Sequence, residues 1–379
     1  MRLRVATGLV SVVASLLLGG CAGDEERLFV GVVDDAARSG DPAAFVAELA
    51  ESGFDALAVS STWDPGETAP DDAEVETLRA VASAADDEDV RLFVLVYHPG
   101  SATTPLTPEA RAAFARYAAA VATEVDGVRD LIVGNEPNLN RFWLPQFGAN
   151  GEIVSAAGYL ELLAETYDAV KAARDDVRIW GGATAPRGAD RPDAPRATTS
   201  PTAFIRGLGE AYRRSGRGRP VMDGFVHHPY AESARVPVDL PHPNVTTIGL
   251  ADYGKLVGLL REAFDGTAQA GSELPILYGE FGVETEIPPV KTPLYTGEEP
   301  VATVSEQAQA AAYRRALELV VCQPRVVGML VFHLRDEPAL TGWQSGVRYA
   351  DGTPKESLRP VRDAVRAARE GELDGRCGR

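Results

Sequence analysis

Two glutamates occupy matching places in this sequence, each directly after a short apolar run. The run LIVGNEP, which begins at Leu131, contains Glu136, and the run PILYGEF, which begins at Pro275, contains Glu280. Two carboxyl groups that a fold brings together can divide acid/base and nucleophilic work, provided that a raised pKa keeps one protonated while the other is ionised. Asn and Pro are also common in turns after strands, so either glutamate alone would be an ordinary strand-end residue.

The elements that must position these glutamates follow from the apolar pattern. Eight short runs are nearly all apolar and recur at intervals of roughly 30 to 55 residues. Continuous rather than alternating apolar character is typical of parallel strands that are buried on both faces. We therefore predict strands at Leu28–Val33, Ala56–Ser60, Leu92–Tyr97, Leu131–Gly134, Arg178–Gly181, Gly224–His227, Ile276–Gly279 and Gly328–Phe332.

The segments between these runs have the pattern of amphipathic helices. One begins at Thr107 and Pro108, an N-cap followed by a proline at the first helical position, and continues with apolar residues at spacings of three and four. Similar helices are predicted at Ala43–Leu49, Tyr159–Ala173, Ala203–Tyr212, Tyr253–Phe264, Gln307–Val321 and Leu358–Ala368. Eight strands alternating with helices indicate an α/β protein with a single-domain (β/α)8 TIM barrel over residues 28–379. An open doubly wound sheet is less favoured because no Gly-rich phosphate loop follows the first strand.

Three long insertions follow predicted strands, at Ala185–Pro201, Ala231–Thr247 and Val283–Thr303. Loops after strands form the functional face of a barrel. The barrel therefore predicts that these insertions surround the two glutamates.

Composition limits the partners of this chain. Apolar residues make up 45% of its 379 residues, charged residues make up 24%, and the net charge is −18. Such a chain can bury a large core. Lys and Arg are scattered without a basic cluster, which argues against nucleic acid and against anionic lipid as partners.

The first twenty residues have the pattern of a secretory signal. A basic start is followed by an apolar run that is too short to span a bilayer comfortably, and then by Leu18-Gly19-Gly20-Cys21. This end resembles the lipobox of bacterial lipoproteins, which implies cleavage after residue 20, a diacylglycerol on Cys21 and a linker over residues 21–27. The chain is then expected at the outer face of the bacterial cytoplasmic membrane, held by its lipid anchor only. The alternative is an ordinary secretory signal with a chance cysteine, which gives a secreted protein.

Two further cysteines, Cys322 and Cys377, lie in the last part of the chain. Outside the cytoplasm such a pair can oxidise, so we predict a disulfide between them. The alternative is two free thiols.

Around the two glutamates, the sequence resembles the clan A glycoside hydrolases, which include the cellulase-like family 5 and the xylosidase-like family 39. Asn135-Glu136-Pro137 matches the clan's acid/base motif after strand four, and Gly279-Glu280-Phe281 matches its nucleophile motif after strand seven. The resemblance implies a retaining glycosidase that cleaves β-glycosidic bonds in an oligo- or polysaccharide. Glu136 would be the acid/base and Glu280 the nucleophile, with no cofactor and no metal.

The same resemblance implies further substrate-binding residues. Asn135 would bind the 2-hydroxyl of the sugar. His228 and Tyr230 match a His and a Tyr that the clan often has after strand six; the Tyr would hold the nucleophile, and the His would contact it or the sugar. His228 could instead be purely structural. The sequence departs from the clan where strand eight often ends in a Trp, because Phe332 and His333 stand there, and no clear match to an early-strand Arg is present.

Aromatic side chains near strand ends could stack on sugar rings. The candidates are Trp63, Trp143 and Trp343, and the last could replace the missing strand-eight Trp. Each of them could equally be a packing residue. Trp180, inside a predicted strand, is expected in the core.

Three alternatives to this assignment stay open. Glu284 is a rival nucleophile four residues after Glu280. A barrel without activity could bind a glycan or a partner protein. A metal-dependent hydrolase could use histidines near strand ends, although neither His-x-His nor His-Glu-x-x-His spacing is present; these histidines are His98, His227, His228 and His333.

Overall fold

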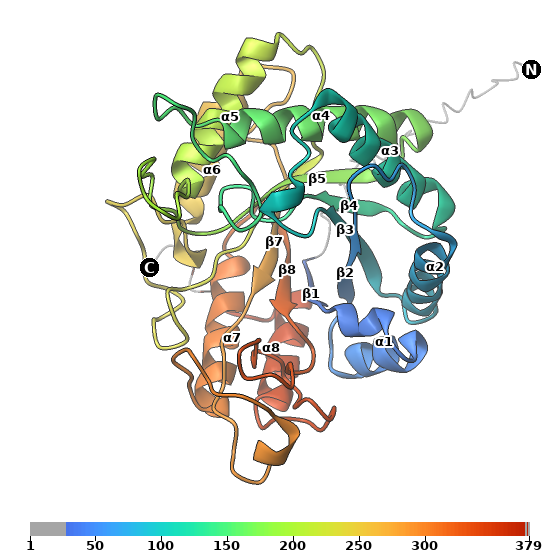
Figure 1. Ribbon diagram of the computed structural model, residues 1–379. Coiled ribbons are helices and arrows are strands. Elements are labelled where there is room, and N and C mark those ends of the chain that lie inside the picture. Colours follow the sequence, from blue (N-terminus) through green and yellow to red (C-terminus); the bar gives the residue numbers. More distant parts are fainter. Residues whose placement is uncertain (1–27, 376, 378–379) are drawn as a thin grey trace, which may run out of the picture.

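The computed structural model describes residues 28–375 and 377. Eight parallel strands form a closed barrel in sequence order, with β8 paired to β1 (Figure 1). The strands are β1 (Phe29–Val33), β2 (Ala56–Thr62), β3 (Arg91–Tyr97), β4 (Asp130–Val133), β5 (Arg178–Thr184), β6 (Gly224–His227), β7 (Ile276–Phe281) and β8 (Val326–Phe332). The predicted (β/α)8 barrel is confirmed.

Eight α-helices alternate with the strands and surround the barrel in the described part of the chain (Figure 1). They are α1 (Pro42–Glu51), α2 (Asp72–Asp87), α3 (Pro108–Glu124), α4 (Ser155–Ala173), α5 (Pro201–Ser215), α6 (Tyr253–Phe264), α7 (Glu306–Val320) and α8 (Leu358–Arg369). Helix α2 is not among the helices predicted from the sequence. It begins after an Asp71 cap, whose side chain accepts a hydrogen bond from the backbone of Glu74. None of the helices within residues 28–375 is long and apolar enough to cross a membrane.

Two apolar layers stabilise the barrel. One lies between strands and helices and includes Phe114 and Tyr159. The other fills the barrel interior and includes Phe93, Trp180 and Leu330. Trp180 is only 1% exposed, as expected for a core residue. The interior of the barrel is therefore packed with side chains.

A buried charge closes the amino end of the barrel. Asp130, which is fully buried at the start of β4, accepts hydrogen bonds from Arg91 and Arg178 and from the Trp180 indole at 2.7 Å. The Arg91 guanidinium also lies over the Phe29 ring, 4.4 Å from its centroid. A buried carboxylate needs such partners because it has lost its hydration.

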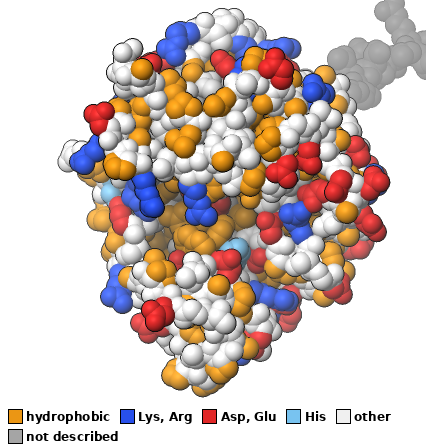
Figure 2. All heavy atoms as spheres, viewed as in Figure 1, with side chains coloured by type: hydrophobic (Ala, Val, Ile, Leu, Met, Phe, Trp, Pro, Cys, Tyr) orange, Lys and Arg blue, Asp and Glu red, His pale blue; other side chains and the backbone are white. Residues whose placement is uncertain are grey.

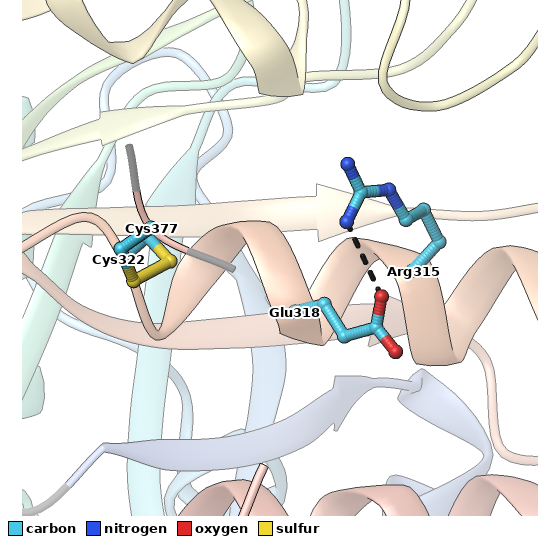
Figure 3. Close-up of a disulfide and its surroundings, with 4 residues drawn as sticks. All are labelled: Arg315, Glu318, Cys322 and Cys377. Atoms are coloured by element: carbon cyan, nitrogen blue, oxygen red, sulfur yellow. Dashed lines mark hydrogen bonds and ion pairs between the residues drawn. A yellow bond between two sulfur atoms is a disulfide. The ribbon is translucent and has the colours of Figure 1, made fainter. Parts of the chain in front are cut away.

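The C-terminal tail is joined to the end of α7. Cys322 and Cys377 form a disulfide with their Cα atoms 5.3 Å apart, and Figure 3 shows it beside the last turns of α7. On the preceding turn of the same helix, Arg315 and Glu318 form an ion pair at 3.2 Å. Cys21 and the predicted signal and linker lie outside the described residues.

Candidate active site

The two glutamates of the sequence motifs meet at the carboxyl end of the barrel. Glu136 follows β4, Glu280 lies in β7, and both line a cavity of about 510 Å³ formed by the loops after β4 to β8. Figure 2 shows a hollow in the centre of the corresponding face, with basic groups along its upper edge and acidic and histidine groups at its lower right edge. The fold therefore places both carboxyl groups at one accessible site.

The backbone around Glu136 has an unusual conformation. Gly134 has φ +76° and Glu136 has φ +40°, the left-handed region that non-glycine residues rarely adopt. At Gly134 a Cβ atom would lie 3.0 Å from Cε2 of Tyr159, which is a second reason for glycine. The Glu136 N–H donates to the Ala183 carbonyl at 2.8 Å. This bond holds Glu136 in a conformation that costs of order 1–3 kcal/mol.

A bulge in β5 supplies that carbonyl. The strand pairing shifts between Gly181 and Thr184, and Gly182 and Ala183 both have positive φ. The buried Tyr159 hydroxyl donates to the Val133 carbonyl at 2.7 Å and accepts from the Gly182 N–H at 2.8 Å. Tyr159 thus links the end of β4 to the bulge in β5, and this link positions Glu136.

His228 and Tyr230 connect the two carboxyl groups, as the sequence motif after β6 suggested. The His228 Nδ1 atom lies 3.3 Å from Glu136 Oε1 and 3.6 Å from Glu280 Oε2. The Tyr230 hydroxyl donates to Glu280 Oε2 at 3.1 Å. A Cβ on Gly279 would lie 2.4 Å from Val226 and 3.2 Å from the His228 ring, so glycine is required directly before Glu280.

The pKa values of Glu280 and His228 are both shifted in the site. Burial raises the pKa of Glu280 and the charge of Glu136 adds to this effect, whereas His228 and Tyr230 oppose it. Burial alone would lower the pKa of His228, but the charges of Glu280 and Glu136 raise it above its ordinary value. The raised pKa of Glu280, the candidate nucleophile, therefore comes first from its burial.

Aromatic side chains form one wall of the cavity. The Trp343 ring centroid lies 5.1 Å from that of Tyr230 and 5.2 Å from that of Phe332, and all three residues line the cavity. The structure thus places Trp343 where the sequence analysis expected an aromatic surface.

The other two candidate tryptophans lie elsewhere. Trp63 is 1% exposed and packs on Phe114, and Trp143 is 2% exposed and packs on Tyr159. Neither lines the cavity. Both assignments to substrate binding are corrected to packing, because the loops after β2 and β4 turn these rings into the core.

Two further polar residues line the cavity. Asn135 has a buried Oδ1 atom without a hydrogen-bond partner in the described structure, and this atom is available to a ligand hydroxyl. Glu284 is 8% exposed, and burial with the nearby charges of Glu299 and Asp336 raises its pKa to about 7. Tyr230 and His228 both contact Glu280, which favours Glu280 over Glu284 as the candidate nucleophile.

The cavity also contains residues that the sequence analysis missed. Arg141, Arg187 and Glu232 line it from the loops after β4, β5 and β6. The only signal for them was their place in loops that follow strands, and many other charged residues share that signal.

Three of the candidate ligands could hold a cation. The ligand atoms of Glu136, His228 and Glu280 lie within 4.8 Å of one another. The remaining candidate histidines are outside this group and have other contacts in the described structure. His98 bonds to the Gly100 carbonyl, His227 to Thr184 and the Ile248 carbonyl, and His333 lies 3.6 Å from Asp34.

Several solved structures have a fold similar to that of this chain. No family model and no curated protein matches the sequence. A family 39 glycoside hydrolase from the gut symbiont Bacteroides cellulosilyticus has a TM-score of 0.63 and 17% identity, over 90% of this chain and 64% of that one. A family 39 enzyme from Xanthomonas axonopodis pv. citri has a TM-score of 0.55 and 15% identity, over 89% and 65%.

A Bacteroidetes-affiliated family 5 cellulase linked with a polysaccharide utilization locus has a TM-score of 0.57 and 13% identity, over 91% of this chain and 92% of that one. The chain spans less than two thirds of the length of the two family 39 structures. At these identities the likeness shows a shared barrel fold.

Proposed function

We propose that this chain is a retaining glycoside hydrolase that cleaves β-glycosidic bonds in an oligo- or polysaccharide. The observation that carries the proposal is the proximity of its two carboxyl groups in the cavity, where one oxygen atom of each lies within 4.8 Å of the other. Retaining enzymes have carboxyl groups about 5–5.5 Å apart, whereas inverting enzymes need about 6.5–9.5 Å to admit a water. Structural neighbours that are named as glycoside hydrolases support the proposal at the level of fold.

In the first step, Glu280 attacks the anomeric carbon and Glu136 donates its proton to the departing oxygen. The Tyr230 hydroxyl and the His228 ring lie on the attacking carboxylate and favour its ionised form. The Asn135 Oδ1 atom accepts a sugar hydroxyl, and Trp343 offers an aromatic face to the ring.

In the second step, water releases the sugar from Glu280. Glu136, now ionised, takes a proton from that water, and the water oxygen attacks the anomeric carbon. The proton count closes, because Glu136 loses one proton in the first step and regains one in the second. Two inversions at the same carbon give retention of configuration.

The test is kinetic assay of Glu136→Ala and Glu280→Ala on aryl β-glycosides and on unactivated glycosides, with product stereochemistry by NMR. Glu280→Ala should lose activity on every substrate, and azide should then give an inverted product. Glu136→Ala should still react with dinitrophenyl glycosides, which need little protonation, and azide should then give a retained product. Near wild-type activity of either variant on an unactivated glycoside would disprove the assignment.

The matched comparison is Glu284→Ala, since Glu284 is the rival carboxylate in the same cavity. If Glu284→Ala loses activity on every substrate and Glu280→Ala does not, Glu284 is the nucleophile. If the wild-type chain shows no hydrolysis and no labelling by a covalent mechanism-based sugar probe, the barrel is a binding protein.

A metal-dependent hydrolase is the second candidate, and the grouping of Glu136, His228 and Glu280 favours it. Incubation with a chelator separates the two functions. Loss of activity that a divalent cation restores would support the metal, whereas unchanged activity supports the double displacement.

We also propose that Cys21 carries the lipid anchor. The supporting observation is the lipobox-like Leu18-Gly19-Gly20-Cys21 after an apolar run. Cys21→Ser should release the protein from the membrane fraction or leave it unprocessed. Unchanged lipid labelling of that variant would contradict the proposal.

A further inference from the structure

Arg187 places a cation in the wall of the active-site cavity. It lies three residues after the end of β5, lines the cavity and is half-buried. Its Nη1 atom donates to the Tyr230 carbonyl at 2.9 Å. Among residues 28–375, no carboxylate forms an ion pair with this guanidinium.

The surroundings of Arg187 leave its charge only partly compensated. Burial lowers the pKa of its guanidinium, and the charges of Glu232 and Glu136 oppose this effect. Glu232 is exposed and its Oε1 atom lies 3.0 Å from His242 Nε2, while Glu136 is held by His228. A half-buried guanidinium has five N–H donors, so most of them remain for a ligand in the cavity.

The cavity has basic groups in the loops after β4 and β5, and acidic groups from the β4, β6 and β7 ends. Arg187 and Arg141 come from the loops after β5 and β4, and the Arg141 guanidinium lies over the Phe142 ring, 5.3 Å from its centroid. Glu280 and Glu284 come from β7 and its loop. A negative group on a substrate would be attracted to these guanidinium groups and repelled by the carboxyl groups.

We infer that the substrate carries an anionic substituent, a carboxylate or a sulfate ester, on the leaving-group side of the scissile bond, and that Arg187 binds it. This inference rests on the proposed glycosidase function. Glu136 donates its proton to the departing oxygen, and Arg187 has Glu136 among its charged neighbours. The planar guanidinium matches both anions, because each offers two oxygens to its parallel N–H groups.

The test is calorimetric binding of the full chain to thio-linked β-disaccharides, which the enzyme cannot hydrolyse. Three probes differ only at C6 of the reducing-end ring, which carries a hydroxymethyl group, a carboxylate or a 6-O-sulfate. One or both anionic probes should bind about 10- to 100-fold more tightly than the neutral probe. The probe that binds more tightly shows whether the anionic group is a carboxylate or a sulfate ester. The difference in affinity from the neutral probe should decrease as the salt concentration is raised.

Arg187→Gln should remove this preference, and Arg187→Lys should keep part of it. Arg191→Gln is the matched control, because Arg191 is an exposed arginine of the same loop that does not line the cavity. Thermal melting establishes that each variant is folded.

The inference is overturned if no anionic probe binds more tightly than the neutral one, or if Arg187→Gln weakens all three probes equally. These outcomes are independent of the kinetic test on Glu136 and Glu280, because binding is measured without turnover. A glycosidase without a preference for anionic probes would refute this inference and leave the proposed function in place.

Discussion

Tyr230 offers a sensitive test of how the site controls its nucleophile. Its hydroxyl donates to Glu280 Oε2 at 3.1 Å, and its ring packs on Trp343. Tyr230→Phe removes the hydroxyl and keeps the ring. Hydrogen bonds to charged groups contribute about 1.5–3 kcal/mol, and a contact of this length belongs at the lower end. A loss of about 1.5 kcal/mol corresponds to roughly a tenfold fall in kcat/KM.

The pH profile separates this role from simple packing. The Tyr230 hydroxyl lowers the pKa of Glu280, so its removal raises that pKa further. Glu280 must be ionised to attack, and activity is lost as pH falls through its pKa. The acidic limb of the kcat/KM profile should therefore move to higher pH in Tyr230→Phe. The control is Tyr212→Phe, whose hydroxyl donates to the Arg219 carbonyl at the outside of the barrel.

The reasoning would be refuted if Tyr230→Phe kept both wild-type kcat/KM and the wild-type acidic limb. A fall in kcat/KM without a shift of the limb would mean that Tyr230 acts through packing on Trp343 alone.

Three further predictions concern stability. Asp130→Ala should leave Arg91 and Arg178 without their buried partner and lower the free energy of unfolding by about 3 kcal/mol, measured by denaturant titration. Glu284 has a folded-state pKa raised to about 7, so it binds its proton more tightly in the folded state and stability falls as pH rises from 4.5 to 7. Glu284→Gln should therefore increase the free energy of unfolding by about 1–2 kcal/mol at pH 8, measured as a higher Tm. It should have little effect at pH 4. Cys322→Ser should cost about 2–4 kcal/mol in non-reducing buffer and nothing in reducing buffer.

The barrel and its two glutamates could be predicted from sequence because their signals are local. Each strand is a continuous apolar run, and a glycine stands two residues before Glu136 and directly before Glu280. A Cβ at Gly134 would meet Tyr159, and a Cβ at Gly279 would meet Val226. The helix α2 could also have been predicted, since its apolar residues Val75, Leu78 and Val81 keep helical spacing after the Asp71 cap.

The walls of the cavity could not be predicted because they depend on the paths of loops. Trp63 and Trp143 lie near strand ends in the sequence, yet both loops fold back and bury them. Arg187 lies in the insertion Ala185–Pro201 beside Arg191 and Arg196, and only the path of the loop brings Arg187 to the cavity. The bulge at Ala183 has no sequence signal beyond the neighbouring glycines, although its carbonyl holds Glu136.

The amino end of the barrel, closed by Asp130, is also where β1 begins. Phe29 opens β1 and lies beside Arg91 at that end, while Glu136 and Glu280 lie at the other end of the strands. The six residues of β7 rise about 20 Å, so the two ends are separated by most of the height of the barrel. A tether attached before residue 28 would hold the molecule by its base, and its mouth would face away from the surface that bears the tether. Such an orientation suits glycan chains that approach from the surroundings, and it disfavours sugars that lie flat on the same surface.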